Sequence, residues 1–169
     1  MKTTEMIYCP RCAATLETRE IDGRERRACA AEGCDYVFWD NPTPVVAAIV
    51  EMAGTDEVIL VRNKGWPEKW LGLVSGFLER GETPEAAARR EVGEELGLTC
   101  DETSFLGVYP FFERNELILA YHVMASGAVT MGEELAAHKA IPVARLKPWP
   151  FGTGPAVADW LRRRRPTGG

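Results

Sequence analysis

The sequence feature that most limits the possible folds and functions of this chain is a short acidic helix whose two ends are clearly marked. Thr83 precedes Pro84, which predicts a threonine cap followed by a proline at a position where its missing N–H costs nothing. Gly97 supplies the left-handed residue that commonly ends a helix. Apolar residues recur every four positions between these ends, and they are Ala88, Val92 and Leu96. This spacing predicts that one face of the helix packs against a core.

The same helix carries three glutamates close together. Glu91, Glu94 and Glu95 repel one another, and each like-charge pair on a helix costs roughly 0.2–0.5 kcal/mol. Arg90 lies four residues before Glu94 and can hold its carboxylate in place. A solvated acidic face is the simplest interpretation, and we expect all three glutamates on an exposed face. The alternative is that a cation binds there.

The spacing around the helix favours the cation. It resembles the Nudix box without a departure: Gly76, five residues, Glu82, seven residues, Arg90-Glu91, an apolar and any residue, Glu94-Glu95, any residue, Gly97 and an apolar residue. With seven fixed identities at frequencies of about 6%, a chance match is on the order of 10⁻⁹ per window. The chain is therefore similar to Nudix hydrolases, which cleave nucleoside diphosphates linked to another group. The resemblance implies an α/β/α sandwich with a mixed sheet.

The resemblance also implies roles for individual residues. Ligands for Mg²⁺ or Mn²⁺ would be the Ser75 carbonyl, Glu91, Glu94, Glu95 and Glu134. Catalytic roles would fall to Glu82, Arg90, Glu94 and Glu134, with Arg90 orienting a carboxylate. Glu134 is preferred over Glu133 as the remote acidic residue because of the apolar spacing that follows it, and a solvated surface glutamate is the alternative. Divalent cations prefer oxygen ligands and neutralise a pyrophosphate, which a chain of net charge -5 could not otherwise hold.

Four cysteines fall in the first forty residues and predict a second metal site. They are Cys9, Cys12, Cys29 and Cys34. The pairs "CPRC" and "CAAEGC" are separated by sixteen residues that suit a hairpin with a turn at Asp22-Gly23. In a chain without an evident export signal, such pairs favour Zn²⁺ over disulfides, and four thiolates leave no open coordination position. A module below about 40 residues needs a bound metal ion or a similar cross-link to fold. The alternative is that the four cysteines are unrelated structural thiols.

The remaining sequence predicts the domain layout. We expect a zinc ribbon over residues 1–40 and an α/β Nudix domain over residues 41–169. Strands are predicted at residues 45–50, 57–62, 105–109 and 117–124, and a final helix from about residue 155. Strands, a helix, more strands and a last helix are typical of a mixed α/β sandwich.

A zinc ribbon before a Nudix domain resembles the NADH pyrophosphatase-like branch. That resemblance implies cleavage of NAD(H), ADP-ribose or FAD to AMP and a phosphorylated product. The chain departs from the branch after the box, where "VYPFFERNE" replaces an array of the Ser-Gln-Pro-Trp-Pro-Phe-Pro type. Phe77 matches a position that stacks on adenine in this branch, although a core role is the alternative. Trp66 is a second candidate for base stacking, whereas Trp70 is predicted to lie in the core.

Charge and hydropathy limit the partners. The net charge of -5 gives no general attraction to nucleic acid or to an anionic membrane, and no apolar run suits a signal peptide or a membrane span. We expect a cytoplasmic protein whose partner is a small-molecule dinucleotide or nucleoside diphosphate, with a homodimer as a further option. Two alternatives remain: a pyrophosphatase that removes unwanted nucleoside triphosphates, and a nucleic-acid-binding or regulatory protein on a Nudix scaffold.

Overall fold

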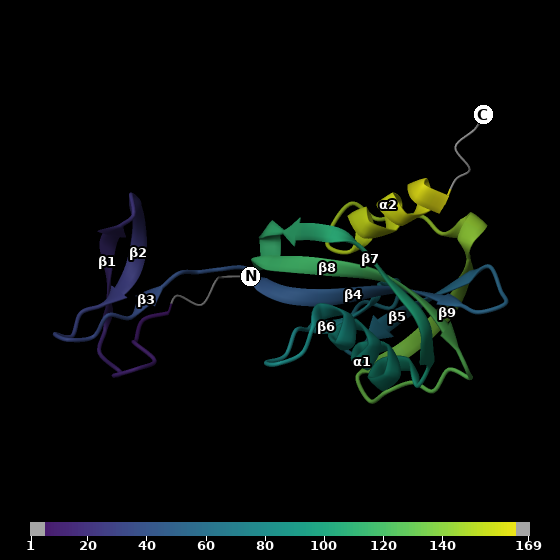
Figure 1. Ribbon diagram of the computed structural model, residues 1–169, viewed down its shortest axis with the longest axis horizontal. Helices are drawn as coiled ribbons and strands as arrows, with labels where there is room; N and C mark the ends of the chain where they lie inside the picture. Colours follow the sequence, from purple (N-terminus) through teal and green to yellow (C-terminus); the bar gives the residue numbers. More distant parts are fainter. Residues whose placement is uncertain (1–5, 165–169) are drawn as a thin grey trace. The chain divides into compact units, whose positions relative to one another are not determined.

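The computed structural model describes residues 6–164 and divides the chain into two compact units. The first unit is Met1–Asn41 and the second is Pro42–Gly169 (Figure 1). Residues 1–5 and 165–169 lie outside the described part. Within residues 6–164, no helix combines the length and the apolar character that crossing a bilayer requires.

The first unit is a small antiparallel sheet. Its strands are β1 (Leu16–Ile21), β2 (Arg24–Cys29) and β3 (Val37–Phe38), in the order β1-β2-β3. Asp22 and Gly23 join β1 to β2 with φ angles of 52° and 72°. Two successive left-handed residues are what a tight hairpin turn requires, so the predicted turn is confirmed.

The second unit is built on a six-stranded mixed sheet. Its strands are β4 (Thr43–Met52), β5 (Glu57–Asn63), β6 (Val74–Phe77), β7 (Thr99–Phe111), β8 (Glu116–Ser126) and β9 (Leu135–Pro142). The order is β7-β8-β4-β5-β9, and β6 pairs with β4 beside this path. Strands β4 and β8 are parallel, while the other pairs are antiparallel. The four predicted strands are confirmed, whereas β6 and β9 were not predicted.

The two helices begin and end where local chemistry allows. Helix α1 (Pro84–Leu96) begins after Thr83, whose hydroxyl accepts a hydrogen bond from the Ala86 N–H at 3.2 Å. It ends at Gly97, which has a φ angle of 66° and donates its N–H to the Gly93 carbonyl. Both predicted ends of this helix are confirmed. Helix α2 (Gly154–Arg164) follows near the predicted start, and two short 3-10 turns, η1 (Phe112–Arg114) and η2 (Val143–Arg145), complete the unit.

Burial on both faces of β4 explains the three layers. Val46, Ala48 and Val50 point to the face that α1 covers, where Val92 and Leu96 of the helix are fully buried. The alternate residues of β4, Ala47 and Ile49, pack on the other face against α2 residues Ala156, Val157 and Trp160. Each buried valine or leucine side chain contributes roughly 1.5–3 kcal/mol. The predicted α/β/α sandwich is therefore confirmed (Figure 1).

Trp70 corrects one prediction about the core. Its side chain is 54% exposed and contacts Phe151 with 6.1 Å between the ring centroids and a tilt of 46° between the rings. The residue lies in the loop between β5 and β6, where the backbone turns instead of presenting a side chain to the sheet. Trp70 is thus a surface residue, and its large apolar side chain did not indicate burial.

Candidate active site

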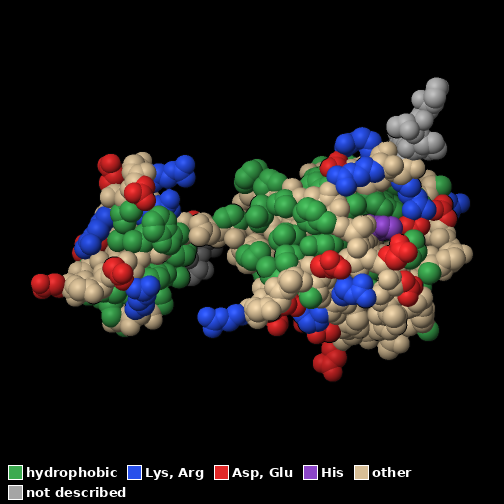
Figure 2. Space-filling model, viewed as in Figure 1, with side chains coloured by type: hydrophobic (Ala, Val, Ile, Leu, Met, Phe, Trp, Pro, Cys, Tyr) green, Lys and Arg blue, Asp and Glu red, His purple; other side chains and the backbone are tan. Residues whose placement is uncertain are grey.

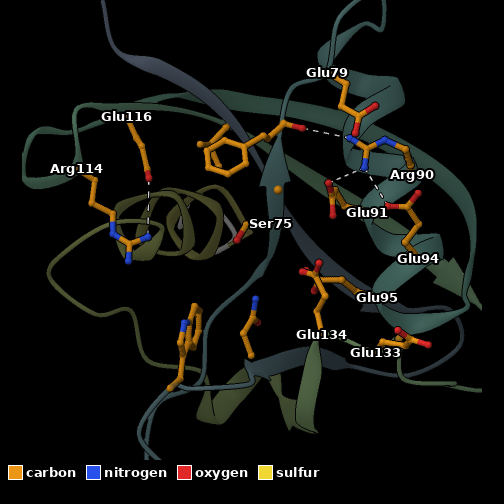
Figure 3. Close-up of a pocket in the computed structure, with 16 residues that line it drawn as sticks. Ser75, Glu79, Arg90, Glu91, Glu94, Glu95, Arg114, Glu116, Glu133 and Glu134 are labelled. Atoms are coloured by element: carbon orange, nitrogen blue, oxygen red, sulfur yellow. Dashed lines mark hydrogen bonds and ion pairs between the residues drawn. The ribbon is translucent and has the colours of Figure 1, made fainter. Parts of the chain in front are cut away.

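A pocket of about 580 Å³ opens beside α1, β6 and the loop before β9. Eight of the predicted site residues line it: Trp66, Ser75, Phe77, Arg90, Glu91, Glu94, Glu95 and Glu134. Glu82 does not line the pocket. Figure 3 shows Glu91, Glu95 and Glu134 directed into the same space from two different elements. The pocket therefore joins predicted site residues that are up to about seventy positions apart in the sequence.

Arg90 organises the acidic wall of the pocket. Its guanidinium donates to Glu82 at 2.8 and 3.2 Å, to Glu91 at 2.6 Å and to Glu94 at 3.0 Å. It also donates to the Phe77 carbonyl at 3.2 Å. The bond to Glu82 is the main cause that holds the pKa of Arg90 well above its usual value. The same contact, aided by the Glu79 N–H, lowers the pKa of Glu82.

Glu95 is a buried carboxylate in the acidic wall of the pocket. The prediction that it lies on an exposed face of the helix is therefore wrong. Its side chain is 5% exposed, and Oε2 has no hydrogen-bond partner among the described residues. Burial first, and then the charges of Glu91 and Glu134, raise the pKa of Glu95 to about 8, although the Ser75 N–H opposes this rise. Helix α1 turns Glu91 and Glu95 toward β6, whereas the Glu94 side chain is 61% exposed. The helical spacing in the sequence did not indicate that Glu91 and Glu95 point toward β6 while Glu94 is exposed.

Two glycines allow the acidic residues to approach closely. A Cβ atom at Gly76 would lie 1.9 Å from Oε1 of Glu91, so a side chain at this position of β6 would displace the Glu91 carboxylate. A Cβ atom at Gly132 would lie 2.3 Å from the Glu94 carbonyl, and the Gly132 N–H donates to the Glu95 carbonyl at 2.9 Å. Gly132 thereby holds the loop before β9 against α1. This contact brings Glu134 to the pocket.

The acidic group suits a divalent cation. Burial and the charges of Glu94 and Glu134 raise the pKa of Glu91, and Arg90 opposes this rise. Repulsion among Glu91, Glu95 and Glu134 together with the unpartnered oxygen of Glu95 is the pattern that Mg²⁺ or Mn²⁺ would relieve, because these ions prefer carboxylate and carbonyl oxygens. Glu134 lies beside Glu95 in Figure 3, whereas Glu133 extends away from it.

The opposite wall of the pocket contains two residues that the sequence did not indicate. Arg114 and Glu116 line it across from the acidic group (Figure 3). Phe77, which is 62% exposed, also lines the pocket, and hydrophobic side chains gather at the end of the unit where β4 and β8 begin (Figure 2). The only sequence signal for Arg114 and Glu116 was that "VYPFFERNE" departs from the expected array.

In the first unit, the four cysteine thiols lie together. The four Sγ atoms, from Cys9, Cys12, Cys29 and Cys34, are all within 4.8 Å of one another. The Cys12–Cys29 pair is 3.4 Å apart and the Cys9–Cys34 pair 3.8 Å, while a tetrahedral zinc site with Zn–S bonds of about 2.3 Å places its sulfurs about 3.8 Å apart. Although burial opposes ionisation, the N–H groups of Arg11 and Cys12 lower the pKa of Cys9 to about 7. The thiols therefore suit Zn²⁺.

Comparison with curated proteins gives NAD-capped RNA hydrolases among the relatives of this chain. The NAD-capped RNA hydrolase NudC of Mycobacterium bovis is 36% identical over 81 residues, or 48% of this chain. The NAD-capped RNA hydrolase NUDT12 of Pongo abelii is 28% identical over 125 residues, or 70% of this chain. Each alignment covers 26% of the relative, so the chain spans about a quarter of the length of the curated relatives it matches.

Solved structures share the fold, and the family pattern covers most of the chain. A NUDIX hydrolase from Nitrosomonas europaea aligns with a TM-score of 0.75 at 21% identity, covering 94% of this chain and 92% of its own. The NUDIX domain of Shewanella oneidensis NrtR, solved in complex with ADP ribose, aligns with a TM-score of 0.60 at 17% identity, covering 72% and 88%. The NUDIX domain pattern itself matches residues 42–161. With that match, the shared fold and an intact box around the acidic pocket, the chain belongs to the Nudix family.

Proposed function

We propose that the pocket hydrolyses the pyrophosphate bond of an adenine-containing nucleoside diphosphate derivative of the NAD(H), ADP-ribose or FAD class. The products would be AMP and a phosphorylated second half. The buried, unpartnered carboxylate oxygen of Glu95 beside Glu91 and Glu134 is the observation that carries this proposal. The names of the curated relatives as NAD-capped RNA hydrolases and the ADP ribose bound to NrtR support the substrate class.

The acidic wall supplies the ligands in this proposal. Mg²⁺ or Mn²⁺ would be held by the Ser75 carbonyl, Glu91, Glu94, Glu95 and Glu134. When bound, such ions neutralise the pyrophosphate and lower the pKa of a bound water. Arg90 keeps Glu91 and Glu94 in place through its hydrogen bonds, and Glu82 positions Arg90 from behind the pocket. Glu82 would thus act through Arg90 without touching the substrate.

Phe77 and Trp66 would bind the base. The exposed ring of Phe77 lies in the pocket and offers a stacking surface, which is worth roughly 0.5–1.5 kcal/mol beyond its buried area. Trp66 lies on the same pocket, and its ring packs over Gly72, where a Cβ atom would come within 3.0 Å of it. Because the chain lacks the array found after the box in NADH pyrophosphatases, NADH would not be strongly favoured over ADP-ribose or FAD.

The first unit would serve structure alone. We assign residues 1–40 to a zinc ribbon in which Cys9, Cys12, Cys29 and Cys34 hold one Zn²⁺, and residues 41–169 to the hydrolase domain. Four protein thiolates fill a tetrahedral site and leave no position for a reacting water. The zinc would therefore stabilise the ribbon.

A substrate panel tests the proposed function. The purified chain is incubated with Mg²⁺ or Mn²⁺ and NADH, NAD⁺, ADP-ribose, FAD or dGTP, and the products are identified by mass. The proposal expects AMP from all four adenine dinucleotides and derivatives. Hydrolysis of dGTP at least tenfold more efficiently, a gap of about 1.4 kcal/mol in transition-state binding, would replace it with the triphosphate function. No hydrolysis of any compound would favour a regulatory protein.

A further inference from the structure

Arg114 and Glu116 have no role in the hydrolysis described above, yet both face the pocket. They lie across from Glu91, Glu95 and Glu134 (Figure 3). Their segment follows β7, where the chain replaces the array of the NADH pyrophosphatases with "VYPFFERNE". A position opposite the phosphate-binding residues is where the base of a bound nucleotide would extend. The two residues are therefore candidates for base recognition.

Strand register places Glu116 close to the stacking surface. Val45 of β4 pairs with Phe77 of β6 on one side and with Ile118 of β8 on the other. Paired residues point to the same face of a sheet, and Glu116 lies two residues before Ile118, on that same face. At about 4.8 Å between strands and about 3.3 Å per residue, the Cα atoms of Glu116 and Phe77 are about 12 Å apart. A purine stacked on Phe77 and a glutamate side chain span this gap.

The carboxylate of Glu116 lies near the Arg114 guanidinium but does not form a hydrogen bond with it. Its side chain is 16% exposed, and Oε1 lies 3.9 Å from the Arg114 guanidinium, which is longer than a hydrogen bond. Arg114 is 56% exposed, so its guanidinium is the more solvated partner. Glu116 begins β8 and pairs there with Phe111 of β7 and Thr43 of β4, which fixes its backbone. The site thus presents a fixed acceptor to the pocket.

We propose that Glu116 selects adenine over 6-oxo purines by accepting a hydrogen bond from the exocyclic amino group of a base stacked on Phe77. This inference rests on the proposed function, because it assumes that a nucleotide occupies the pocket. An ionised carboxylate only accepts hydrogen bonds. Adenine presents an N–H donor at its 6-position, whereas hypoxanthine and guanine present an oxygen there. A carboxylate aligned with the 6-position would face that oxygen, lose the bond and be repelled by it, because the N1–H donor of these bases lies at the neighbouring ring position. Tighter binding of IMP than of AMP would show that the carboxylate faces N1 instead and would overturn the inference.

Paired substrates test the selection. We expect the wild-type chain to hydrolyse ADP-ribose with at least tenfold higher kcat/KM than its hypoxanthine analogue. In Glu116→Gln the amide can turn to offer either its N–H₂ or its oxygen, so the ratio should fall below threefold, mainly through KM. Glu113→Gln is the matched control, because Glu113 is an exposed glutamate in η1, just before β8, that does not line the pocket. It should keep the wild-type ratio.

Binding measurements separate this inference from the proposed function. Dissociation constants for AMP and IMP, measured by calorimetry, report base selection even if the chain hydrolyses neither substrate, an outcome that would refute the proposed function alone. Equal affinity of the wild-type chain for AMP and IMP, or an unchanged ratio in Glu116→Gln, would overturn the inference. If Glu116→Gln fails to fold, as judged by circular dichroism, Glu116→Ala replaces it, with the same loss of selection expected.

Discussion

Replacing Glu95 with glutamine should stabilise the protein in the absence of divalent cations. Burial and the charges of Glu91 and Glu134 raise the pKa of Glu95 from 4.5 to about 8. Between these values the folded protein binds a proton that the unfolded chain has already lost. The free energy of unfolding of the wild type therefore falls as pH rises through this range, because stability follows the difference in bound protons.

The size of the change in stability follows from the shift in the pKa of Glu95. Each pKa unit corresponds to about 1.36 kcal/mol, and Glu95 is half ionised at pH 8, so its contribution falls by about 2 kcal/mol between pH 6 and pH 8. Glutamine has the same shape and does not titrate, and its side-chain oxygen can still accept the Ser75 N–H. The difference in free energy of unfolding between Glu95→Gln and wild type should thus grow by about 2 kcal/mol from pH 6 to pH 8.

Urea denaturation at pH 6, 7 and 8 measures this difference. Tryptophan fluorescence reports mainly on the second unit, which contains four of the five tryptophans. Magnesium and manganese are omitted, and no chelator is added because it would compete for zinc in the first unit. With a urea dependence of about 2 kcal/mol per molar, the midpoints of the two proteins should separate by about 1 M more at pH 8 than at pH 6.

Glu94→Gln serves as the control for this experiment. Glu94 is also a box glutamate, but its side chain is 61% exposed, so its replacement should change stability by less than about 0.5 kcal/mol at each pH. The reasoning fails if Glu95→Gln is less stable than wild type at pH 8. It also fails if the difference between the two proteins is the same at pH 6 and pH 8.

Three further predictions concern other parts of the molecule. Glu51, which is 2% exposed, accepts a hydrogen bond from Arg164 at 2.7 Å and contacts His122 at 2.8 Å. Glu51→Gln loses a charge-assisted bond and should lower the free energy of unfolding by about 1.5 kcal/mol in urea denaturation, and a change below about 0.5 kcal/mol would contradict this. Cys12→Ser should reduce zinc from about one equivalent per chain to less than half in elemental analysis, and full zinc content would argue against the four-thiolate site. Phe77→Ala should raise KM for ADP-ribose more than it lowers kcat, and steady-state kinetics with an unchanged KM would exclude stacking on this ring.

The sequence predicted those parts of the fold that depend on contacts between residues close together in the chain. Thr83, Pro84 and Gly97 fix both ends of α1 without reference to the rest of the chain. The apolar run in β4 is buried on both faces, so its pattern alone identified a central strand. Strand β6 was missed because it has four residues and forms only by pairing with β4. Strand β9 was missed because, at the edge of the sheet, only Leu135 of its eight residues is buried.

The candidate site likewise contains features that the sequence predicted and features that it did not. The box spacing indicated which glutamates share the pocket with Arg90, but it did not indicate that Glu95 is buried. Nor did it indicate that Gly76 of β6 leaves room for the Glu91 carboxylate beside the helix. Arg114 and Glu116 reach the pocket through the pairing of β8 with β4 and β7. Such contacts join distant parts of the chain, and a single sequence contains no direct signal for them.

The release of AMP from ADP-ribose by wild type and Glu95→Gln, followed as Mg²⁺ is added, tests the central claim most directly. The account predicts no AMP without a divalent cation and a saturable increase with Mg²⁺ for the wild type. Glu95→Gln, although more stable, should turn over at least about a thousandfold more slowly, which corresponds to about 4 kcal/mol in the barrier. AMP release that needs no divalent cation, or undiminished turnover by Glu95→Gln, would contradict the account.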